Sequence, residues 1–197
     1  MHLSLKLNSR QLPIFYQLLG HGFSLNIRTG CSVKDLLCEQ LGIHENYLAR
    51  RIQTIFLNGK VVDDQNSAIV EENATLALSG AMPGLVGAIL RSGGFYAAMR
   101  RQISHEKTNP AQREQTGNIT LKLLNLVVKD LGPTFLQRGV WIKGDTLQEF
   151  IKRYAEELRA GSISGELDGK PAGIDTLLKT DLDNDPVLLK ISSDPEA

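Results

Sequence analysis

The chain has 197 residues, of which 42% are apolar and 22% are charged, and its formal net charge is zero at pH 7. This composition is typical of a folded globular protein and excludes a chain that is disordered throughout. A zero net charge provides no overall positive field to attract a polyanion, so we expect no nucleic-acid partner.

Two cysteines, Cys31 and Cys38, lie seven residues apart on one predicted helix. The first residues, Met1 to Leu5, lack the basic and apolar regions of a secretory signal peptide. We therefore expect a cytoplasmic protein with reduced thiols.

The first part of the chain predicts a sheet crossed by one helix. Apolar and polar residues alternate in two runs, and each run predicts a strand with one buried face. Ser32 with Asp35 three residues later predicts a capping box at the start of a helix from about Ser32 to Leu41. Asn58-Gly59 between apolar runs predicts a tight hairpin, because both turn residues need a positive φ angle. The two alternating runs are residues 3–7 and 23–28; residues 11–19 between them predict a short helical or looped cover, and residues 74–79 predict a last strand.

The same order of patterns returns from Asn118. The matching segments are residues 119–123, 139–144, 146–158, 168–169 and 187–191. Five elements that match in the same order indicate an internal repeat. We therefore predict an α+β chain of two tandem ββαββ domains, residues 1–80 and 118–197, joined by residues 81–117. The pattern leaves open whether each copy folds alone or both share one core.

This arrangement resembles the β-grasp, or ubiquitin-like, fold. The first copy resembles in particular the small sulfur-carrier branch, the thiamine and molybdopterin carriers, through residues 32–37, residues 57–60 and the apolar last strand. Those carriers are adenylated and then thiolated at a C-terminal Gly-Gly. In this chain the only Gly-Gly, Gly93-Gly94, is internal. The resemblance thus implies a carrier, with an adenylating enzyme as its partner, if the chain is cut after Gly94.

The segment from Gly80 to Met99 matches neither copy. It is apolar, rich in glycine and followed by two arginines. It is too short for a membrane span, and Arg91 near its middle would cost about 2.5 kcal/mol or more in a bilayer. One interpretation is that its apolar side chains fill a seam between the two domains. The other is a binding site, where glycines let the backbone approach a ligand or partner and arginines bind an acidic group. The candidate partner-binding residues are Gly84, Gly87, Arg91, Gly93, Gly94, Phe95, Tyr96, Arg100 and Arg101.

No pattern for catalysis, a cofactor or a metal stands out. The four histidines have no metal-ligand spacing with one another or with the cysteines. Residues 181–185 are similar to the start of a calcium loop, but Pro186 stands where that loop needs glycine, so we interpret them as a turn. We therefore predict a non-enzymatic protein-interaction module that binds another protein or a second copy of itself. The alternatives are a sulfur-carrier or modifier precursor activated at the internal Gly-Gly after processing, and an enzyme with an unrecognised site.

Overall fold

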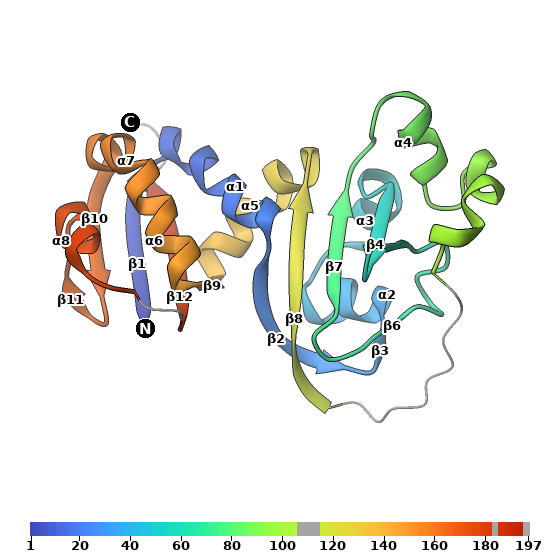
Figure 1. Cartoon of the computed structure of the whole chain (residues 1–197), viewed down its shortest axis with the longest axis horizontal. Coiled ribbons are helices and arrows are strands. Elements are labelled where there is room, and N and C mark those ends of the chain that lie inside the picture. The colour runs from blue at the N-terminus through green and yellow to red at the C-terminus, as the bar shows by residue number, and fades with distance from the viewer. Residues whose placement is uncertain (106–114, 183–184, 195–197) are drawn as a thin grey trace. The chain divides into compact units, whose positions relative to one another are not determined.

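The computed structural model describes residues 1–105, 115–182 and 185–194. The chain is α+β and divides into two compact units (Figure 1). The terminal unit consists of residues 1–23 and 128–197, and the central unit consists of residues 24–127. Residues 106–114 of the expected linker and residues 183–184 of the expected turn lie outside the described residues.

The terminal unit combines the start of the chain with its last third. Its elements are β1 (His2–Asn8), η1 (Ser9–Phe15), α1 (Tyr16–His21), α5 (Leu126–Arg138), β9 (Val140–Lys143), α6 (Gly144–Arg153), α7 (Ala155–Gly161), β10 (Ser162–Leu167), β11 (Lys170–Pro171), α8 (Ile174–Lys179) and β12 (Pro186–Asp194). The strand order is β11-β10-β1-β12-β9, with β1 parallel to β12 and antiparallel to β10.

The central unit contains the expected hairpin at Asn58-Gly59. Its elements are β2 (Phe23–Thr29), β3 (Cys31–Ser32), α2 (Val33–Asp35), η2 (Leu36–Gln40), α3 (Glu45–Arg51), β4 (Thr54–Leu57), β5 (Lys60–Val61), β6 (Ile69–Val70), β7 (Thr75–Ser79), α4 (Gly84–Leu90), η3 (Phe95–Ile103) and β8 (Gln115–Leu124). The main strand order is β2-β8-β7-β4-β5, with β7 parallel to β8, and β3 pairs with β6 separately.

The first strands of the two sequence copies are exchanged between the units. β1, from the first copy, lies beside β12, and β8, from the second copy, lies beside β7. The units therefore differ from the expected division into residues 1–80 and 118–197, because each unit contains the first strand of the other copy. Both strands alternate buried with less buried residues, three buried in β1 and four in β8, so hydrophobic patterning cannot decide which sheet takes which strand.

The two hairpins have the same hydrogen-bond geometry, as the repeat predicts. Asn58 and Asp168 both have φ near 50°, and each is followed by a glycine with φ below 80°. Val62 N–H donates to Ile55 O, and Ala172 N–H donates to Gly165 O in the same way. The turn side chains also act alike: Asn58 Oδ1 accepts from Thr75 N–H of β7, and Asp168 Oδ1 accepts from His2 N–H of β1. β1 therefore stands in the terminal sheet where β7 stands in the central sheet.

The helix expected from Ser32 is confirmed. Ser32 Oγ accepts a hydrogen bond from Asp35 N–H at 3.1 Å, which is the predicted cap. The second half is π-helical, with Leu41 N–H donating to Leu36 O. Leu36 and Leu37 are fully buried in the core of the central unit.

The helix expected over residues 146–158 is interrupted. α6 ends at Arg153, Tyr154 adopts a non-helical conformation, and α7 follows. α6 begins at Gly144 rather than at Thr146, and Gly144 N–H donates to Asp185 O from the segment before β12. A backbone carbonyl from a distant segment thus satisfies an N–H group at the start of the helix.

Candidate functional site

The candidate site is formed by residues 80–105, which we call the linking segment. It folds as two adjacent helices of the central unit. α4 and η3 are joined by the turn Ser92-Gly93-Gly94 (Figure 1). Gly93 has φ +62°, a conformation that glycine adopts without strain. Gly84 opens α4 with φ +76°, and Gly87 is buried in the middle of that helix. A Cβ at Gly87 would clash with the Met82 carbonyl, so only glycine allows this close approach.

A single buried arginine, Arg100, links α4 and η3 to Asp63, which follows β5. Arg100 is 3% exposed, and its guanidinium has five N–H donors. Nε donates to Ile89 O at 2.6 Å, and Nη2 donates to Arg91 O at 3.0 Å. Nη1 and Nη2 reach the two carboxylate oxygens of Asp63 at 2.8 and 2.6 Å, and Nη1 also donates to Ser104 Oγ at 2.8 Å. All five donors therefore have partners inside the central unit.

Backbone and side-chain hydrogen bonds fix the turn and the end of the segment. Ser92 N–H donates to Gln53 O at 2.9 Å, and its hydroxyl donates to Val62 O at 2.8 Å. Gly93 N–H donates to Asp63 Oδ1 at 2.9 Å. His105 N–H donates to Val61 O at 2.7 Å, which places the end of the segment on the outer side of β5. The linking segment is therefore anchored at its middle turn and at its end.

Asp63 is the charged partner in this arrangement. Its hydrogen bonds from the Arg100 guanidinium lower the pKa of the carboxyl below its ordinary value, and the Gly93 N–H acts in the same direction. Partial burial opposes this effect. The carboxylate is thus held in its charged form, as its ion pair with Arg100 requires. We call this ion pair, together with the other hydrogen bonds of the Arg100 side chain, the Arg100 clasp.

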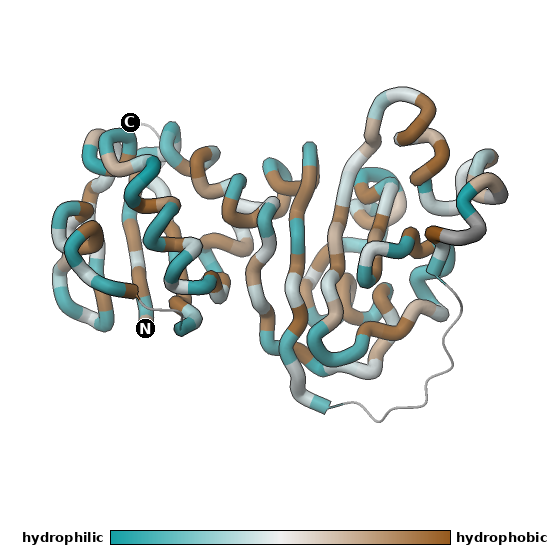
Figure 2. Tube along the Cα trace, viewed as in Figure 1, coloured by the Kyte–Doolittle hydropathy of each residue, from teal (hydrophilic) through white to brown (hydrophobic). Residues whose placement is uncertain are grey.

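The outer side of the segment exposes large apolar side chains. Phe95 is 94% exposed, Met99 73%, and Leu85 and Val86 66% each. In η3 the exposed residues Phe95, Met99 and Ile103 recur every fourth position. Figure 2 shows the strongly hydrophobic colour of the chain around α4. We call Leu85, Val86, Phe95, Met99 and Ile103 the apolar surface.

The structure separates the predicted site residues into two groups. Arg91, Phe95 and Tyr96 are exposed and available to a partner. Arg100 is not, so the expectation that it binds a partner's acidic group is wrong, because Asp63 and the backbone already take its donors. The side chain of Arg101 lies outside the described part.

Several of the largest side chains of this segment are exposed, among them Leu85, Val86 and Phe95. The predicted Gly93-Gly94 lies in an anchored turn, with Gly94 N–H donating to Arg91 O at 3.1 Å. A cut after Gly94 would place Arg100 on a different fragment from Asp63.

The sequence does not identify the other contributors to the site: the side chains of Asp63 and Ser104 and the backbone carbonyls of residues 53, 61 and 62. Asp63 follows the predicted hairpin strand, and an acid at the end of a strand carries no signal for a partner that lies 37 residues later. Gln53 and Val61 contribute backbone carbonyls, whose role does not depend on the residue type.

In the part of the chain that the structure describes, no cluster of His, Cys, Asp and Glu could hold a metal ion. None of the helices in the described residues has the length and apolar character that crossing a bilayer requires. No protein-family model, no curated protein and no solved structure matches this chain.

Proposed function

We propose that the chain is a non-enzymatic protein-interaction module and that the apolar surface on α4 and η3 is its binding site. The observation that carries this proposal is an exposed set of large apolar side chains on a segment that is anchored by the Arg100 clasp. Exposed apolar groups of this size on a folded domain are typical of interaction sites. Because the backbone is already fixed, binding would cost little ordering of the chain.

The charge of the segment indicates the chemistry of the partner. Residues 80–105 contain three arginines and no aspartate or glutamate. Asp63 neutralises Arg100, whereas Arg91 is exposed on the same segment as the apolar surface. We infer a partner protein with an apolar groove that is flanked by carboxylates.

A second copy of the chain is a less favourable partner for this surface than a different protein. A two-fold contact would bring the same positively charged surface of both copies together. Residues 80–105 contain no acid that could neutralise this charge. We therefore propose a different protein, and not a second copy, as the partner.

The proposed scaffold is a pair of β-grasp-like units that have exchanged their first strands. The order β2-β8-β7-β4-β5, with a capped helix after β2, supports this for the central unit. In the terminal unit the same sheet positions are filled by β9-β12-β1-β10-β11. The central positions of the terminal sheet are filled by β12 and β1, which come from the two ends of the chain. Two simple tandem domains would not be connected in this way.

The alternative function, a carrier precursor cut after Gly94, makes a different prediction for the mature protein. We favour the uncut chain because Arg100, which lies beyond the cut, holds the turn closed through Asp63 and two backbone carbonyls. The intact mass of the protein from its own cells distinguishes the two: a full-length mass supports the interaction module, and a chain that ends at Gly94 supports the carrier.

The binding site is tested with Phe95→Asp and Met99→Asp. Both residues are exposed, so the variants should fold and melt like the wild type. A partner that co-purifies with the wild type from the native cells is then purified and titrated with each variant. We expect at least tenfold weaker binding for both variants and unchanged binding for Lys129→Asp, an exposed position on α5 in the terminal unit, away from both proposed binding surfaces. Equal affinity of all four proteins would refute the proposed site.

A further inference from the structure

The outer edges of the two hairpins have equivalent positions in their units. The linking segment contacts this edge in the central unit, and the edge in the terminal unit is open. The register pairs Leu57 with Lys60 in one hairpin and Leu167 with Lys170 in the other. Counting from these pairs, Gln53 corresponds to Ile163, Val61 to Pro171, Val62 to Ala172 and Asp63 to Gly173. In the central unit these four positions hold the linking segment, through Ser92, Gly93, Arg100 and His105.

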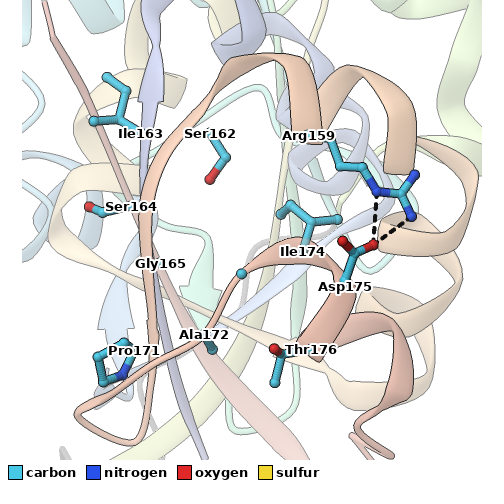
Figure 3. Close-up of a pocket in the computed structure, with 11 residues that line it drawn as sticks. Arg159, Ser162, Ile163, Ser164, Gly165, Pro171, Ala172, Ile174, Asp175 and Thr176 are labelled. Atoms are coloured by element: carbon cyan, nitrogen blue, oxygen red, sulfur yellow. Dashed lines mark hydrogen bonds and ion pairs between the residues drawn. The ribbon is translucent and has the colours of Figure 1, made fainter.

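At the equivalent place in the terminal unit there is an open groove. It has a volume of about 600 Å³ and is lined by the start of β10, the end of β11 and the start of α8. Figure 3 shows Ser162 and Ile174 between β10 and the start of α8, with Arg159 and Asp175 on the far side. Within the described residues, the lining comes from residues 159–176 alone, and no distant segment enters the groove.

We propose that this groove binds a polypeptide segment of a partner protein, in the place that the linking segment takes on the central unit. The central unit shows what such an edge accepts: a chain segment that donates N–H groups to the carbonyls of the hairpin. The inference goes beyond the proposed function, because it concerns a second surface on the other unit.

The groove residues suit this role. In the central unit the carbonyl of Val61 accepts a hydrogen bond from His105 N–H. Its counterpart Pro171 has no N–H but has a carbonyl that can accept in the same way. β11 pairs with β10 at Glu166 and Leu167, so the ladder on the outer side of β10 stops before Ser162. Ile163 is 55% exposed at the position of Gln53. An added segment would thus extend a hydrogen-bonded edge and cover one exposed apolar side chain.

The groove does not suit the linking segment of a second copy. Asp63, which receives Arg100, is replaced here by Gly173, and the nearby Asp175 already accepts from Arg159 at 2.9 and 2.8 Å. The arginine would therefore lose its carboxylate partner. This difference favours a segment of another protein, one that does not need to bury an arginine in the groove.

The direct test is selection of peptides on the full-length protein. A displayed library of random 12-residue peptides is enriched on the wild type, and the enriched peptides are titrated against Thr176→Trp and Lys179→Trp. Both residues are exposed on α8, but only Thr176 lines the groove. We expect tenfold weaker binding to T176W and binding within twofold of the wild type for K179W. The proposal is overturned if no enriched peptide distinguishes the two variants, or if T176W dissolves a dimer of the wild type.

A second variant tests the equivalence of the two edges. Gly173 precedes α8 with φ −80°, and a Cβ there meets no atom within 4 Å, so Gly173→Asp fits the fold. A synthetic peptide with residues 92–105 should bind G173D at least tenfold more tightly than the wild type, because the new carboxylate replaces that of Asp63. The same peptide with Arg100→Ala should lose this gain. Equal binding of both peptides to G173D would contradict the equivalence.

Discussion

Arg100 is the residue on which the candidate site depends. Its side chain is fully buried and makes five hydrogen bonds, including two to Asp63. We expect Arg100→Ala to lower the free energy of unfolding of the central unit by about 2–3 kcal/mol, the scale of lost hydrogen bonds to a charged group. Arg91→Ala, at an exposed position, should change it by less than about 0.5 kcal/mol. Chemical denaturation of both variants measures the difference, and equal stability would show that the clasp contributes nothing.

The clasp also predicts a pH dependence. The pKa of Asp63 is lower in the folded protein than in the unfolded chain, where it is about 3.9. A lowered carboxyl pKa stabilises the fold above the unfolded value, and this stabilisation is lost as the pH falls toward the folded value. The stability difference between the wild type and Asp63→Asn should therefore be constant from pH 5 to 8 and shrink below about pH 4. A difference that grows on acidification would contradict the assignment.

At the scale of single elements, the capped helix and the hairpins could be predicted because their signals are local. Ser32 with Asp35 and the Asn58-Gly59 turn depend on neighbouring residues alone. α3 was not predicted, although Glu45 in its first turn and Arg50 and Arg51 in its last turn suit the helix dipole. Its short length left too few apolar positions for a periodic pattern.

The helices contribute to the cores through residues that the sequence identified. Leu36 is fully buried in the central unit, and Phe150 is 6% exposed in the terminal unit, where its ring lies 5.0 Å from that of Phe15. Leu36→Ala and Phe150→Ala should each lower the unfolding free energy by about 2–5 kcal/mol. Thermal unfolding checks both, with Leu85→Ala as the exposed control. Melting curves like that of the control would show that these faces are not core.

At the scale of the whole molecule, strand pairing could not be predicted. β1 and β8 both alternate buried and less buried residues, and this period alone therefore fits either sheet. Which strand is chosen depends on long-range contacts, as the side chains of Asn58 and Asp168 illustrate: each binds a strand that the local sequence does not specify. The candidate site was found by its unusual composition, but its geometry depends on the distant Asp63.

The exchange itself can be tested by cross-linking. Ser4 of β1 lies opposite Lys190 of β12, and both residues are exposed. Adjacent strands bring Cα atoms close enough for a disulfide. The double variant Ser4→Cys with Lys190→Cys should form an internal disulfide in the monomer under oxidising conditions, and Ser4→Cys alone should not. Tryptic mass mapping identifies the linked peptides, and a variant that stays reduced would contradict the pairing of β1 with β12.

The central claim is that a partner protein covers α4 and η3. Hydrogen exchange of the chain, measured alone and with the purified partner at saturating concentration, tests it most directly. We predict slower exchange across residues 84–103 in the complex, and no such change when Phe95→Asp replaces the wild type at the same partner concentration. Protection confined to other residues, with residues 84–103 exchanging at the same rate in both states, would contradict the account.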